Sequence, residues 1–98
     1  MNKELPKNIE AEKSLIGSMF WSRDSLQKGC EEVEKEVFYL ESNAKIFEAI
    51  KELYLNNSPV DITSVTTYLI STNKIKEVGG VEYLNEIVNS VATGANIE

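Results

Sequence analysis

The sequence lacks the residues on which several kinds of active site depend. It contains no histidine, which excludes a Ser-His-Asp triad, an imidazole metal site and an imidazole proton shuttle. Its one cysteine, Cys30, can form neither an internal disulfide nor a zinc site built from several thiolates. A short chain without a disulfide framework fits a reducing compartment, and we therefore expect a cytoplasmic protein.

Long hydrophobic runs and clustered positive charge are also missing. No stretch of about 18 apolar residues occurs, and the N-terminus lacks the apolar block of a secretory signal. The 10 basic and 16 acidic residues give a net charge of −6. Phosphate binding is mainly the work of clustered Lys and Arg. We therefore expect neither a membrane span nor direct nucleic-acid binding by this chain.

Glycine-rich phosphate loops are absent from the sequence as well. Neither G-x-x-x-x-G-K-[ST] nor G-x-G-x-x-G occurs, and Glu77 and Glu82 flank the one glycine pair with the wrong charge for a phosphate. We expect no cofactor, no metal ion and no catalytic residue in this segment.

The residues that are present predict a small helical domain. A chain of 98 residues suffices for one hydrophobic core. Apolar residues three and four positions apart predict five helices, and residues 93–98 predict a turn and the start of another. The expected fold class is all-α, a compact bundle of about five to six short helices over residues 8–98, preceded by an N-terminal arm at residues 1–7. A strand over residues 60–68 is the alternative to the fourth helix.

Polar residues and breakers indicate where the helices begin and end. Asn8 is suited to cap the first helix and Asp61 the fourth, while Ser42 is the candidate cap of the third. The second helix is expected from about residue 24 to residue 33. The third is expected to stop at the breaker cluster 56–59.

Three glycines have expected structural roles. Gly17 interrupts the apolar stripe of the first helix, and close approach of another helix would compensate for its low helix propensity. Gly79 and Gly80 permit backbone dihedrals that other residues resist, so they predict a sharp turn before the fifth helix.

An acidic run follows the cysteine. Residues 31–41 hold five glutamates and one lysine. This run can be interpreted as a solvated face, an acidic docking surface or a catalytic pair. No residue in the sequence would raise the pKa of one of these carboxyl groups for catalysis. Cys30 precedes this run and reads as a small buried residue, because a reactive thiol needs a positive neighbourhood. On the third helix, Glu48 is expected to pair with Lys45 or Lys51.

Three aromatic residues are candidates for a partner interface. Phe20 and Trp21 end the first helix, and Trp21 either covers the edge of the core or enters a partner surface. Tyr83 follows the glycine turn, and its ring can pack while its hydroxyl stays in water. Core packing and partner contact both remain open for Tyr83.

Several blocks of sequence resemble one protein family in order. They are LPKNIEAE at 5–12, LIGS at 15–18, FY at 38–39, IFEAI at 46–50, PVD at 59–61, EVGGVEYL at 77–84 and ANIE at 95–98. Together these blocks resemble the N-terminal region of the bacterial replicative DNA helicases, the DnaB family, over nearly the whole chain.

The resemblance implies that two parts of the protein carry different functions. Members of the family are hexameric motors that unwind duplex DNA at the replication fork, and they bind ATP and Mg²⁺ in a C-terminal RecA-like domain that this chain does not contain. The N-terminal helical head associates in pairs, contributes to the collar of the hexameric ring and receives primase, so self-association, primase and a helicase loader are the expected partners. A stand-alone helical adaptor or regulator is the alternative.

Overall fold

The computed structural model describes residues 8–95 and places five α-helices and one short 3-10 helix there. No strand occurs among these residues, so the all-α prediction is confirmed and the strand alternative for residues 60–68 is wrong. The predicted N-terminal arm, residues 1–7, lies outside the described residues. The elements are α1 (Ile9–Trp21), α2 (Arg23–Glu32), η1 (Lys35–Val37), α3 (Glu41–Leu55), α4 (Ile62–Ser71) and α5 (Gly80–Ala95).

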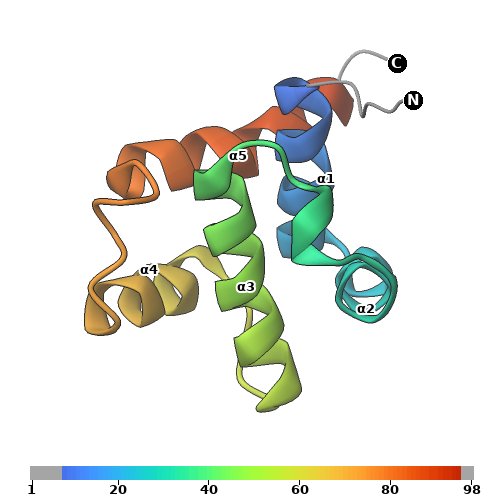
Figure 1. Ribbon diagram of the computed structural model, residues 1–98. Helices are drawn as coiled ribbons and strands as arrows, with labels where there is room; N and C mark the ends of the chain where they lie inside the picture. The colour runs from blue at the N-terminus through green and yellow to red at the C-terminus, as the bar shows by residue number, and fades with distance from the viewer. Residues whose placement is uncertain (1–7, 96–98) are drawn as a thin grey trace.

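The helices surround α3, which runs through the middle of the bundle (Figure 1). Helix α1 makes its most extensive contacts with α5 and α2, whereas α3 contacts α1, α2, η1 and α4. Helix α5 crosses one end of the bundle and also contacts α4. The core between them is aliphatic with one phenylalanine at its centre, since the largest fully buried apolar side chains are Phe47, Ile16, Met19, Ile46, Ile50, Leu69, Leu84, Ile87, Val65 and Val78.

Two of the three predicted helix caps are confirmed. The side chain of Asn8 accepts a 2.9 Å hydrogen bond from the backbone N–H of Ala11 and caps α1. The side chain of Asp61 accepts a 2.7 Å bond from the N–H of Ser64 and caps α4. Each acceptor satisfies a donor that the first turn of a helix would otherwise leave unpaired.

The predicted cap of the third helix is wrong. Ser42 lies inside the first turn of α3, whose N-cap is Leu40, a residue without a capping side chain. The carboxylate of Glu12 on α1 reaches this helix end instead. It accepts hydrogen bonds from the backbone N–H groups of Tyr39 and Leu40, at 2.6 and 3.4 Å. A side chain from another helix therefore binds the backbone just before α3 and at its N-cap, and it places a negative charge near this helix N-terminus.

The segment before α3 anchors to the core through a single residue. Phe38 is 7% exposed, and its ring centroid lies 5.2 Å from that of Phe47. Its neighbours Val37 and Tyr39 are exposed.

The three glycines behave as expected. A Cβ atom on Gly17 would lie 2.5 Å from the backbone oxygen of Ile87, so α1 and α5 approach each other there more closely than a larger residue allows. Gly79 and Gly80 have φ angles of 103° and 80°, which turn the chain into α5.

The end of the chain differs from the prediction. Helix α5 continues through Thr93 and Gly94 to Ala95, so no turn interrupts it there. The expected start of another helix falls on residues 96–98, which lie outside the described residues.

Candidate partner interface

Tyr83 connects α5 to α3 through its hydroxyl group. The ring is half-buried, and the hydroxyl donates a 2.6 Å hydrogen bond to Oδ1 of Asn43. Burial raises the pKa of the Tyr83 hydroxyl above its usual value. The hydroxyl that was expected to stay in water therefore has a buried amide as a hydrogen-bond partner. The exposed part of the ring lines a shallow hollow at the start of α5.

Asn43 extends the connection to a third helix. Its side chain has no exposed surface, and Nδ2 donates a 2.9 Å hydrogen bond to the carboxylate of Glu12 on α1. Through the bonds from Tyr39 and Leu40, the same carboxylate also holds the start of α3. Glu12, Asn43 and Tyr83 thus form one polar bridge between α1, α3 and α5 in an otherwise apolar core.

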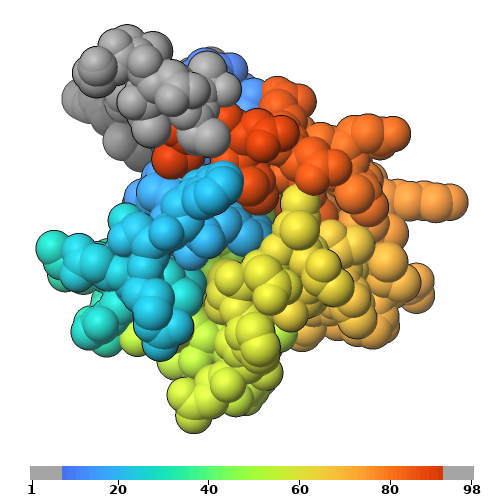
Figure 2. Space-filling model, turned by 180° about the vertical axis from the view of Figure 1, so that it is seen from behind, coloured from blue at the N-terminus to red at the C-terminus, as the bar shows by residue number. Residues whose placement is uncertain are grey.

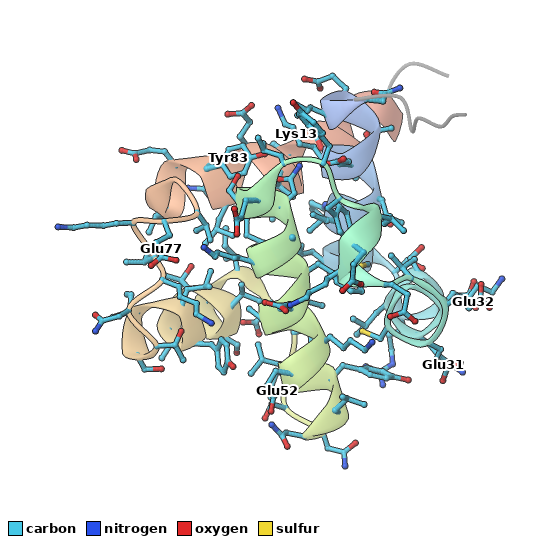
Figure 3. The ribbon with its side chains drawn as sticks, viewed as in Figure 1. Lys13, Glu31, Glu32, Glu52, Glu77 and Tyr83 are labelled. Atoms are coloured by element: carbon cyan, nitrogen blue, oxygen red, sulfur yellow. The ribbon has the colours of Figure 1, made fainter. Side chains whose placement is uncertain are left out.

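Lys13 lies beside this bridge (Figure 3). It is 7% exposed, and its ammonium group pairs with Glu86 on α5 and lies 3.5 Å from Glu10. It also lies 6.0 Å from the centre of the Tyr83 ring. The hydrogen bond to Glu86 raises the pKa of Lys13, and burial only partly opposes that shift. The aliphatic part of the Lys13 side chain is therefore covered by the α1–α5 contact, while Glu86 and Glu10 neutralise its charge.

Trp21 is the most exposed of the three candidate interface residues. Its side chain is 60% exposed, yet its Nε1 donates a 2.8 Å hydrogen bond to the backbone oxygen of Val88 on α5. Phe20 is half-buried and packs against the core. Both line one side of a groove, whereas Tyr83 lines a separate hollow at the start of α5. The structure therefore brings Phe20 and Trp21 together but not Tyr83.

The groove lies between the end of α1 and the chain that follows α3. It has a volume of about 440 Å³. Figure 2 shows this face, where the light-blue end of α1 and the yellow segment after α3 lie next to each other. The residues that line it are Met19, Phe20, Trp21, Ser22, Arg23, Leu26, Tyr54, Asn57, Ser58, Pro59 and Val60.

The glutamates of the acidic run are exposed, and the cysteine is buried. Glu31 and Glu32 are exposed and point away from the bundle on α2 (Figure 3). Cys30 is 4% exposed, and burial raises the pKa of its thiol. In residues 8–95 no group of three or more acidic or thiol side chains is arranged to hold a metal ion.

One predicted ion pair on α3 is wrong. Glu48 bonds neither Lys45 nor Lys51, but Lys35 of the 3-10 helix, with 2.6 Å between Nζ and Oε2. Lys45 instead pairs with Glu77 at 2.9 Å. Both pairs connect α3 to a neighbouring segment of the chain. Which lysine and glutamate form an ion pair therefore depends on which segments the fold places next to α3.

Sequence reasoning missed the polar bridge, although one signal was present. Asn43 lies four positions before Phe47 and seven before Ile50, so it occupies the buried face of α3. A polar residue at such a position requires a partner. The sequence does not reveal that the partners are Glu12 and Tyr83, because each is far away along the chain.

No helix in the described part of the chain is both long enough and apolar enough to span a membrane.

The whole chain is similar to proteins of one family. The family model for the DnaB-like helicase N terminal domain matches residues 4–98. The chain is 42% identical to the replicative DNA helicase DnaC of Bacillus subtilis (strain 168) over 95% of its length, and 37% identical to the replicative DNA helicase DnaB of Geobacillus stearothermophilus over 95%. In each comparison it spans 20% of the relative's own length.

A solved structure agrees in fold. The crystal structure of the N-terminal domain of DnaB helicase from Mycobacterium tuberculosis superposes with a TM-score of 0.83 at 27% identity. The superposition covers 90% of this chain and 61% of that one. The chain belongs to the DnaB-like helicase N-terminal domain family, as the resemblance in its sequence blocks indicated.

Proposed function

We propose that this chain is the N-terminal domain of a replicative DNA helicase that uses ATP to unwind duplex DNA at the replication fork. In that protein it serves as an oligomerisation and docking domain and carries no catalytic step of its own. The observation that carries the proposal is the family match, which spans residues 4–98. The names of the relatives, all replicative DNA helicases, support the same assignment.

The character of the surface supports docking rather than chemistry. Trp21 is held in place by Val88 while most of its side chain faces outward. Such rigid, exposed aromatic residues are typical anchors of protein interfaces. In this proposal Phe20 and Trp21 form one contact region and Tyr83 a second, and the partners are other copies of the helicase, primase and a helicase loader.

The remaining parts of the activity belong to the rest of the helicase. ATP and Mg²⁺ would bind in its RecA-like motor domain, and this domain would not grip DNA directly, because its net charge is −6. The proposed location is the cytoplasm, because a chain with a single cysteine and no disulfide framework fits a reducing compartment.

Light scattering on the purified chain, alone and with the primase of the same organism, tests this proposal. We expect a complex with primase, and we expect Trp21→Ala or Tyr83→Ala to weaken it. Circular dichroism of each variant separates lost docking from lost folding. If the wild-type chain neither self-associates nor binds primase, the docking function is wrong.

The genomic sequence after the codon for Glu98 provides an independent test. A phosphate loop within a following RecA-like domain supports the helicase assignment. A stop codon at that point favours a stand-alone adaptor or regulator. ATP hydrolysis by the purified chain that persists through repeated purification would contradict the non-catalytic role.

A further inference from the structure

The groove beside Trp21 combines the residue types that most often dominate protein interfaces. Trp21 is the only tryptophan of the chain and Arg23 the only arginine, and both line the groove together with Tyr54. Trp, Tyr and Arg are the residues most enriched among interface hot spots. Leu26 and Pro59 add apolar surface to the same depression.

A hydrogen bond holds one residue in each wall of the groove. On one side the hydrogen bond to Val88 holds the Trp21 indole. On the other, α3 ends in a closed turn, in which Asn57 has a φ of 60° and the N–H of Ser58 donates a 2.9 Å bond to the oxygen of Leu53. A groove with fixed walls loses little conformational entropy when it is occupied, so more of the contact energy appears as affinity.

The charge of the groove differs from that of the chain. Arg23 is the only charged residue that lines it, in a chain with a net charge of −6. Within residues 8–95 no carboxylate forms an ion pair with Arg23, and the neighbouring Asp24 lies 3.5 Å from Lys28 instead. A guanidinium group presents donors that match the two oxygens of a carboxylate. The groove is therefore complementary to an apolar side chain next to a negative charge.

We propose that this groove binds an acidic segment of a partner protein. A bulky apolar side chain of that segment lies against Trp21 and Leu26, and a carboxylate close to it in sequence bonds Arg23. Nucleic acid is a poorer occupant, because one arginine cannot neutralise a run of phosphates.

Selection from a random displayed heptapeptide library on the 98-residue chain tests the proposal. We expect the enriched peptides to carry Asp or Glu within two positions of Leu, Ile, Phe or Met. Enrichment of basic peptides, or of no peptide sequence, would overturn the proposal. The best peptide is then labelled and titrated with the chain by fluorescence anisotropy, with an unlabelled oligonucleotide as competitor. Displacement of the peptide by the oligonucleotide at lower concentration than by unlabelled peptide would also overturn it.

Two charge-matched variants locate the binding site. Arg23→Gln should weaken peptide binding about tenfold, as expected for a lost charge-assisted hydrogen bond. Lys28→Gln removes the same charge from the same helix outside the groove, so its affinity should change less than about twofold. Equal effects of the two variants would show that general charge, rather than this groove, attracts the peptide. Trp21→Ala should abolish peptide binding, with folding checked by circular dichroism.

This inference deepens the proposed docking function and rests on it, but the two can fail separately. Primase binding, measured by light scattering, tests the helicase-domain function and requires no peptide. If primase binds while Arg23→Gln and Lys28→Gln affect the selected peptide equally, only the acidic-segment proposal is wrong. If the peptide binds through Arg23 while primase does not bind, the acidic-segment proposal is supported and the primase assignment is wrong.

Discussion

The hydroxyl of Tyr83 donates a 2.6 Å hydrogen bond to Asn43, a side chain without exposed surface, and so connects α5 to α3. The side chain of Asn43 in turn donates a hydrogen bond to the carboxylate of Glu12 on α1. Three helices are therefore joined by polar contacts whose partners must all be present, because a buried polar group without a hydrogen bond costs more than the bond itself contributes.

Asn43→Leu should strongly destabilise the domain. The substitution removes both hydrogen bonds of the Asn43 side chain and leaves the Glu12 carboxylate and the Tyr83 hydroxyl short of a partner. We expect the free energy of unfolding to fall by about 2–4 kcal/mol, measured by urea unfolding followed by circular dichroism. Asn89→Leu, at an exposed position of α5, is the control and should change it by less than about 0.5 kcal/mol. Equal losses in the two variants would contradict the role of the bridge.

Gly17→Ala should destabilise the domain and Gly29→Ala should not, although both glycines are buried in helices. At Gly17 the new Cβ would lie 2.5 Å from the backbone oxygen of Ile87, which cannot move without shifting α5. At Gly29 it would lie 2.9 Å from the flexible end of Met19, which can turn aside.

The expected magnitudes follow from crowding and helix propensity. Crowding at Gly17 should cost about 1–3 kcal/mol, more than Ala returns through its better helix propensity. Gly29→Ala should be neutral or should stabilise by up to about 1 kcal/mol. Thermal unfolding of both variants beside the wild type checks this. A Gly17→Ala variant as stable as the wild type would show that α1 and α5 are not in tight contact.

The sequence predicted the features that depend on near neighbours. The caps Asn8 and Asp61 bond residues three positions away, and the turn at Gly79 and Gly80 depends on their own dihedral freedom. Even the close approach at Gly17 could be inferred. A glycine inside a helix lowers its stability, and close contact with another helix can compensate for that cost.

The features that depend on the fold could not be predicted in the same way. Ser42 looked like a cap because a hydroxyl near a helix start usually is one, but Glu12, about 30 residues earlier, already occupies that end of α3. Of the candidate interface, the sequence indicated Trp21 as a residue that covers the edge of the core or contacts a partner, but it did not indicate the groove beside it. The opposite wall of the groove consists of Pro59 and its neighbours. These residues are far from Trp21 in the sequence and lie near it only in the fold.

Glu12→Gln should loosen the start of α3. The amide keeps one acceptor oxygen but loses the negative charge that suits a helix N-terminus, and it can no longer accept from Tyr39, Leu40 and Asn43 with two oxygens. We expect a loss of about 1–2 kcal/mol in the free energy of unfolding, measured in urea.

An exposed glutamate provides the control for Glu12. Glu32→Gln makes the same chemical change on α2, where the side chain points to solvent, and should alter the free energy of unfolding by less than about 0.5 kcal/mol. If both variants lose the same stability, the effect reflects net charge, and the hydrogen bonds of Glu12 add no stability of their own at the start of α3.

Alkaline pH should weaken the contacts of α5 with α1 and α3. The hydrogen bond to Glu86 raises the pKa of Lys13, and burial raises the pKa of Tyr83. A group whose pKa rises on folding holds its proton more tightly in the folded chain. Its stabilisation is complete below the unfolded pKa, about 10 for both residues, and is lost as the pH rises through the folded pKa. Thermal unfolding midpoints should therefore fall between about pH 10 and pH 12.

The variant Lys13→Met isolates the contribution of Lys13 to this fall. Lys35 and Lys45 also have raised pKa values, through their hydrogen bonds to Glu48 and Glu77, so the wild-type curve sums several groups. Lys13→Met should show a shallower fall, whereas Lys28→Met, at an exposed lysine paired only with Asp24 among the described residues, should follow the wild type. Parallel curves for the wild type and Lys13→Met would mean that the ammonium group of Lys13 adds no stability to the α1–α5 contact.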